Sequence, residues 1–163
     1  MLMATTNEIT AYKAQLISSI VQNEKIVKAI DSHAESYISG QGDTLINTNI
    51  FPMLRIPDIT EDASTYIGVE VDILQINTKN PSFHKWSVTI WVMAHRDHIF
   101  MKETGYSRLD YISDELRLML QDSLDYGFGV LNLVSNTTNF LNEKFTYRQL
   151  KFVTDDFKKP VYG

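Results

Sequence analysis

Residues 66–95 read YIGVEVDILQINTKNPSFHKWSVTIWVMAH, and this stretch decides the fold. In its first half, every second residue is apolar and falls on one strand face: Ile67, Val69, Val71 and Ile73. The second half repeats the pattern with Trp86, Val88, Ile90, Val92 and Ala94. A two-residue alternation is typical of half-buried strands, and the polar break at residues 77–82 predicts a turn. The stretch therefore predicts a long β-hairpin with one apolar face that other elements must cover.

The N-terminal region carries a helical stripe that suits the role of a cover. Between about Asn7 and Gln22, apolar residues recur on one helix face: Ile9, Tyr12, Leu16, Ile17, Ile20 and Val21. Asn23 is placed to cap a shorter helical piece with Ile26, Val27 and Ile30, so the helix either continues or kinks there. Residues 1–6 are expected to be disordered.

A central helix is predicted from about Arg108 to Leu124. Ser107 and Asp110 approximate a capping box at its start, with aspartate in place of the usual glutamate. Gly127 stands where a left-handed residue often follows the end of a helix. The buried stripe of this helix is expected to consist of Leu109, Ile112, Leu116, Met119, Leu120 and Leu124.

The remaining segments read as extended chain. Pro52 and Pro57 favour an extended connector over residues 50–58, which is too apolar for a solvated linker. Residues 130–134 and 145–157 predict two strands, separated by a turn at residues 135–139. The element order predicts a single α+β domain over residues 1–163. Its antiparallel β-sheet is built on the long hairpin and covered on one face by the N-terminal helical region and the central helix.

Composition is that of a soluble globular protein. The 163 residues, 44% hydrophobic and 21% charged, suffice for one domain that buries roughly 70% of the surface of the unfolded chain. A net charge of -5 and a pI near 5.3 argue against nucleic-acid binding, which depends on Lys and Arg. The absence of cysteine excludes disulfides and thiolate chemistry. Neither a signal peptide nor a membrane-spanning segment is expected.

Three side chains near the end of the hairpin are candidates for chemistry: His95, Asp97 and His98. They could act as metal ligands in a small hydrolase, or as a base with its orienting carboxylate. Their spacing matches no metal or catalytic motif, and on a continued strand His98 falls opposite the other two. The sequence therefore predicts no catalytic residue, no metal site and no cofactor, and the hydrolase remains an alternative.

Glu70 and Asp72 share the polar face of the first strand of the hairpin. Paired carboxylates can serve acid–base catalysis. A solvated face, or pairing with Lys85 across the hairpin, accounts for them equally well.

Several large apolar residues fall outside the periodic stripes, in two irregular segments: Phe51, Met53, Ile99, Phe100 and Met101. A soluble monomer seldom leaves a large contiguous apolar patch in water. We therefore predict that these segments, together with an edge of the sheet, form a subunit interface. The alternative is that they fold back onto their own core.

The order of these pieces resembles the tail-terminator and neck (tail-completion) proteins of tailed bacteriophages. The resemblance covers about Ile50 to Phe157. It rests on the motifs IFP (50–52), IPD (56–58), YIGVEVDI (66–73), SVTIWVMAH (87–95), GYSRLDYI (105–112), GFGVLNL (127–133) and YRQL (147–150).

This resemblance implies a structural virion protein without enzymatic activity. It implies a hexameric ring at the head-proximal end of the tail that terminates the tail tube and contacts the tail-tube protein and the head-connector or neck proteins. Another neck or head-closure role is the alternative. Assembly would take place in the host bacterial cytoplasm, and genome DNA would pass through without specific binding. The face of Glu70 and Asp72 is then a candidate channel lining, because acidic walls repel phosphate.

Overall fold

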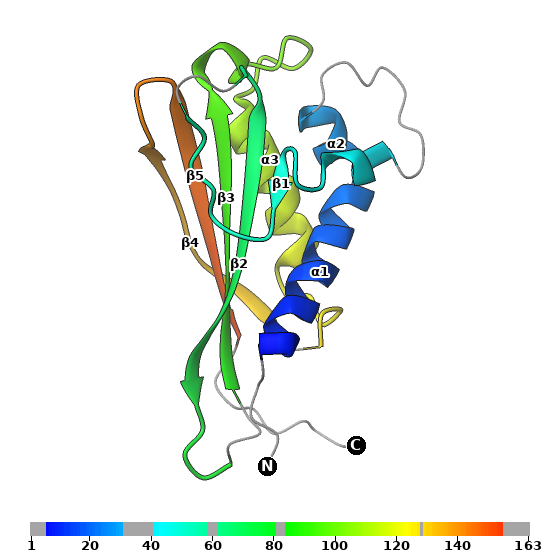
Figure 1. Cartoon of the computed structure of the whole chain (residues 1–163), viewed down its shortest axis with the longest axis vertical. Helices are drawn as coiled ribbons and strands as arrows, with labels where there is room; N and C mark the ends of the chain where they lie inside the picture. Colours follow the sequence, from blue (N-terminus) through cyan, green and yellow to red (C-terminus); the bar gives the residue numbers. More distant parts are fainter. Residues whose placement is uncertain (1–5, 31–40, 59–61, 81–83, 128, 155–163) are drawn as a thin grey trace.

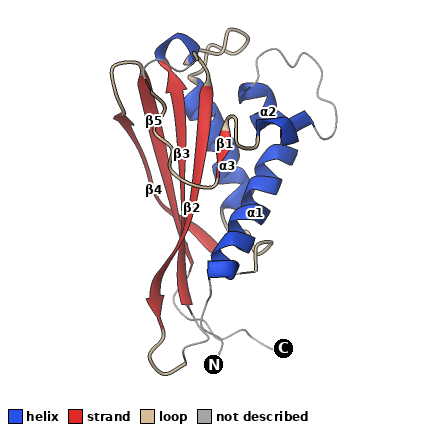
Figure 2. Cartoon of the chain, viewed as in Figure 1, coloured by secondary structure: helices blue, strands red, loops and turns tan. Residues whose placement is uncertain are grey.

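The computed structural model describes residues 6–30, 41–58, 62–80, 84–127 and 129–154. Its elements are α1 (Thr6–Gln22), α2 (Glu24–Ile30), η1 (Gln41–Leu45), β1 (Ile50–Phe51), β2 (Thr65–Ile76), β3 (His84–His95), η2 (Arg96–His98), α3 (Arg108–Leu120), β4 (Leu131–Phe140) and β5 (Phe145–Thr154). The strands form one sheet in the order β1-β2-β3-β5-β4, and the α-helices pack on one face of it (Figures 1 and 2). The predicted α+β class is confirmed.

The predicted hairpin is formed by β2 and β3. Ile67 pairs with Val92, and Val71 pairs with Val88, in an antiparallel ladder that a bulge interrupts at Leu74. At the edge of the sheet, β1 runs parallel to β2, with Ile50 opposite Ile67. The sheet is therefore mixed, because two residues of the expected connector join an otherwise antiparallel sheet.

The main core lies between the sheet and the helices, where the sequence placed it. The apolar faces of β2 and β3 and the three α-helices all contribute fully buried residues to this core: Leu16, Ile20, Ile26, Ile67, Val69, Val88, Ile90, Val92, Ile112, Leu116 and Leu120. At the margin, Ile73 and Met119 are half-buried.

The N-terminal helical region is broken at Asn23. The side-chain Oδ1 of Asn23 accepts a hydrogen bond from Ile26 N at 3.2 Å, which caps α2 after α1 has ended at Gln22. Thr6 is the first residue of α1, and the other residues of the segment 1–6 that was expected to be disordered lie outside the described part of the chain. No described helix is both long enough and apolar enough to span a membrane.

The central helix begins as predicted but ends earlier. Ser107 is its N-cap, although the Ser107 side chain makes no capping hydrogen bond, and Asp110 pairs instead with Arg148 on β5 at 2.7 Å. The helix ends at Leu120, because its C-cap Gln121 has left the helical conformation at ψ 129°, and Asp122 follows at φ 60°. Gly127 is left-handed as predicted, at φ 82°, but it lies beyond the end of the helix. Leu124 therefore lies beyond the helix and is exposed, contrary to its predicted place in the stripe.

Ser135–Asn139 is strand rather than the predicted turn. These residues pair with β5 through a ladder that places Thr137 opposite Gln149 and Asn139 opposite Tyr147. Long-range pairing with β5 has overridden the turn preference of Asn and Ser. The turn comes after Phe140, and β5 ends at Thr154, so the remaining predicted strand residues 155–157 lie outside the described part.

The connector 52–58 crosses the outer face of the sheet, which is the face opposite the helices (Figure 1). The chain passes so close to Gly68 that a Cβ there would lie 2.6 Å from the Met53 carbonyl oxygen. On the same face, a small second core forms from Tyr66, Met93 and Phe145, with Phe51 packed against it. The connector is thus held on its own sheet.

Arg108, the first residue of α3, is a buried charge that the apolar pattern did not reveal. Its guanidinium donates to the Ala29 carbonyl through Nη1 and to the His98 carbonyl through Nε at 2.7 Å. Burial lowers the pKa of this guanidinium, while the charge of Glu103 acts in the opposite direction. Two backbone carbonyls from different segments therefore converge on one side chain.

Candidate functional site

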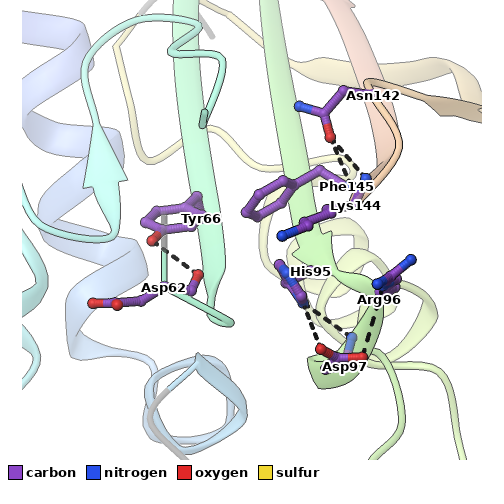
Figure 3. Close-up of polar contacts among 8 residues, drawn as sticks. All are labelled: Asp62, Tyr66, His95, Arg96, Asp97, Asn142, Lys144 and Phe145. Carbon is purple, nitrogen blue, oxygen red and sulfur yellow. Dashed lines mark hydrogen bonds and ion pairs between the residues drawn. The ribbon is translucent and has the colours of Figure 1, made fainter. Parts of the chain in front are cut away.

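The residues that suggested metal or catalytic chemistry lie at the end of β3 and in η2, and Figure 3 shows two of them, His95 and Asp97. His95 is buried, with its ring edge-on to Phe145 at 5.1 Å between centroids. Its Nδ1 accepts a hydrogen bond from Asp97 N at 3.1 Å and lies 3.6 Å from Asp97 Oδ2. His95 therefore acts as the N-cap of its own turn.

His98 has a different partner. Its Nδ1 lies 2.9 Å from the hydroxyl of Thr65, a buried residue on β2. Within the described residues, no three His, Asp or Glu side chains are grouped so that they could hold a metal ion. Because a catalytic zinc site uses three protein ligands and an open position, His95, Asp97 and His98 are not arranged as one.

The same end of the sheet joins three chain segments (Figure 3). Arg96 N donates to the Lys144 carbonyl at 2.7 Å, which ties η2 to the turn between β4 and β5. The Asn142 side chain accepts hydrogen bonds from Lys144 N and Phe145 N, and its Nδ2 donates to the Pro57 carbonyl at 3.1 Å. The connector and the β3–α3 segment, which begins with η2, are therefore each hydrogen-bonded to the β4–β5 turn.

Each of these three segments exposes large apolar side chains. We call the four residues Ile56, Phe100, Tyr106 and Phe140 the end surface. Phe140 is 80% exposed and stands opposite Thr146 at the end of the β4–β5 ladder, and Phe100 is 73% exposed and forms an isolated bridge with Ser107. Aromatic residues are enriched at protein–protein contacts relative to the rest of a protein surface.

The structure divides the predicted interface residues into two groups. Met53 and Phe100 are exposed. Phe51 is half-buried, with the Arg55 guanidinium 4.9 Å from its ring centroid. Ile99 packs against the main core, and Met101 is buried in it. Phe140 was not among the predicted interface residues, although the apolar pair Phe140-Leu141 between two asparagines is a signal that points to it.

Glu70 and Asp72 also differ from each other. Glu70 is half-buried and forms an ion pair with Lys13 of α1 at 2.7 Å, and Lys13 also donates to the Pro52 carbonyl. Asp72 is exposed. Apart from these two residues, the middle of the outer face carries mostly polar side chains, of which the first two are buried: Ser87, Thr89, Ser135, Thr137, Gln149 and Lys151. The indole of Trp91 lies among them and donates to Gln149 Oε1 at 3.2 Å.

Comparison with known proteins adds a family. The YomW family model matches residues 23–154, which is well over half of the chain. YomW is a family derived from Bacillus phage, so the match associates the chain with phages. No curated protein and no solved structure matches.

Proposed function

This chain belongs to the YomW family, and on that premise we propose that it is a structural virion protein of a tailed phage. It assembles in the host bacterial cytoplasm as a hexameric ring and occupies the head-proximal end of the tail. There it terminates the tail tube and joins it to the head connector, without enzymatic activity. Another neck or head-closure position is the alternative within the same class.

The end surface is the observation that carries this proposal. The connector and the β3–α3 segment are each hydrogen-bonded to the β4–β5 turn, and each of these three segments presents apolar side chains to solvent. A neighbouring subunit that covers Phe100 and Phe140 would remove this area from water, at about 25 cal/mol per Å² of apolar surface. If this surface binds a different surface of the neighbouring subunit, the contact is head-to-tail, and a series of such contacts can close into a ring.

The outer face of the sheet is the proposed wall of the ring channel. The middle of this face carries mostly polar side chains, whereas the opposite face of the sheet is covered by helices. Lys151 is the one cation among the outer-face residues named above, so such a wall gives passing DNA few cationic phosphate contacts. Because the charge of Glu70 is balanced by Lys13, the negative charge on this part of the outer face comes from Asp72.

The ring is tested by the mass of the chain in solution. We expect light scattering at micromolar concentration to give about six times the 18.7 kDa of one chain. Phe100→Glu should reduce the particle to the single-chain mass, because a charge in the centre of an apolar contact costs about 2 kcal/mol or more. Its far-ultraviolet circular dichroism should remain that of the wild type, since Phe100 is exposed and its loss leaves the fold of the chain intact.

Leu118→Glu is the matched control, because Leu118 is an exposed apolar residue on α3 and lies outside the end surface. This variant should keep the assembled mass. A wild-type chain that remains at the mass of one chain contradicts the ring. A Phe100→Glu protein that still assembles shows that the end surface is not the interface.

The channel wall is tested by reversing one charge. Asp72→Lys should increase retention of double-stranded DNA at low salt by at least about tenfold, with the gain lost at high salt, because each added phosphate contact steepens the salt dependence. Asp114→Lys makes the same change in net charge on the helical side, at an exposed residue of α3. Equal retention by the two variants would contradict the assignment of the outer face to the channel.

A further inference from the structure

We infer that two uncharged strand edges of this chain, Ser135–Phe140 on β4 and Ile73–Ile76 on β2, pair with each other between neighbouring copies. The inference rests on the proposed ring, because it names the backbone contact that would join one subunit to the next. The partner at each edge is a second copy of this chain.

The first edge is the upper part of β4, which is the last strand of the sheet. At the beginning of β4, the outward-facing backbone groups already have hydrogen-bond partners within the chain. The Leu131 carbonyl accepts from Asp122 N at 2.8 Å, and Leu133 N donates to Gln121 Oε1 at 2.7 Å. No described strand pairs with the outer side from Ser135 onward.

The ladder shows which backbone groups face outward on β4. The backbone N–H and C=O groups of Leu131 and Leu133 point away from β5, and in a strand the groups of every second residue point the same way. The bulge between Leu133 and Ser135 shifts this pattern by one residue. The outward groups of the open edge therefore belong to Asn136, Thr138 and Phe140. Of these, Phe140 N is engaged by the side chain of Asn139.

The second edge is an arm formed by the far end of the hairpin. β5 pairs with β3 only as far as Ser87, so beyond that point β2 and β3 continue as a two-stranded ribbon. Ile67 N donates outward to the Asn49 carbonyl, and the bulge at Leu74 shifts the alternation so that Ile76 also faces outward. An isolated two-stranded ribbon is only marginally stable in water.

The middle of the β2 edge is protected against pairing with another strand, but the two edges named above are not. Along the middle of β2, Pro52 ends β1, and Lys13 bonds both the Pro52 carbonyl and Glu70. Proline and lysine are the residues by which soluble proteins protect edge strands. Residues 131–140 and 73–78, by contrast, contain no charged residue and no proline.

The two edges complement each other in chemistry and position. Each combines open backbone groups with exposed apolar side chains, which are Val134 and Phe140 on β4 and Leu74 and Ile76 on the arm. They lie on opposite edges of the sheet and at opposite ends of the long axis of the molecule (Figure 1). A copy that pairs one of them leaves the other open for the next copy, which is the condition for a head-to-tail assembly.

Two proline variants test the pairing. Thr138→Pro and Ile76→Pro each remove an outward N–H, while the hydrogen bonds within the sheet remain, because neither N–H donates to the neighbouring strand. Each variant alone should have the mass of one chain, and an equimolar mixture should form particles of two chains, because one intact pair of edges remains. Thr138→Val and Ile76→Val keep the N–H and should assemble like the wild type.

The outcomes separate this inference from the proposed function. If the wild type forms a ring and the proline variants form it as well, the edge pairing is wrong and the ring stands. If both variants are single chains but their mixture gives no two-chain particle, the two edges are not partners. A wild-type chain that does not assemble removes both proposals. Lysine at the same two positions repeats the test with every backbone N–H in place.

Discussion

Leu116→Ala is expected to lower the free energy of unfolding by about 2 to 5 kcal/mol. Leu116 is fully buried in the main core, on the face of α3 that packs on the sheet. Removing its three outer carbon atoms loses their transfer free energy and leaves a cavity between rigid elements. Urea unfolding followed by circular dichroism should show an earlier midpoint and an unchanged slope.

The control for Leu116 is Leu118→Ala, two residues further along the same helix. Leu118 is exposed, so its replacement should change the stability by no more than about 0.5 kcal/mol. The two variants have the same change in composition and similar helix propensity, and they differ only in burial. Equal midpoints for the two would mean that the face of α3 that packs on the sheet is not the one described.

The hairpin and its cover could be predicted because their signals are local and repeated. The alternation in β2 and β3 spans many residues, and the covering helices carry stripes of matching period. A single residue that departs from the pattern therefore does not change the prediction of the strands and helices. The main core followed from the sequence for this reason.

The end of α3 and the course of β4 could not be predicted in the same way. The left-handed conformation of Asp122 depends on its backbone bond to Leu131, and Ser135–Asn139 becomes strand through its pairing with β5. Both outcomes depend on partners that are distant in the sequence, and they oppose the local preference of the residues. The patterns of a single segment do not contain this information.

The candidate surface shows the same division. Irregular segments have no period, so the sequence could not tell that Phe100 points outward while its neighbour Met101 is buried. It likewise could not show that Lys13 neutralises Glu70. What composition did indicate is that these segments hold more apolar residues than a solvated loop needs.

Arg108→Met is expected to lower the free energy of unfolding by about 3 to 5 kcal/mol, although it replaces a charged residue with an apolar one of similar length. The guanidinium supplies hydrogen bonds to the carbonyls of Ala29 and His98, and methionine supplies none. Ala29 lies in the last turn of α2, where a positive charge also interacts favourably with the helix dipole. Both carbonyls would then be left without this donor in a buried place.

Arg117→Met is the matched control, because Arg117 lies on the same helix and is partly exposed, with an ion pair to Asp114 at 2.8 Å. Its loss should change the stability by no more than about 1 kcal/mol. The loss in the free energy of unfolding for Arg108→Lys should lie between those of Arg108→Met and Arg117→Met. An ammonium keeps the charge but lacks the planar guanidinium that reaches two carbonyls at once. If Arg108→Met unfolds at the same urea concentration as Arg117→Met, the junction of α2, η2 and α3 is not held by this side chain. The loss should also be independent of salt, because the partners of Arg108 are buried carbonyls rather than exposed carboxylates.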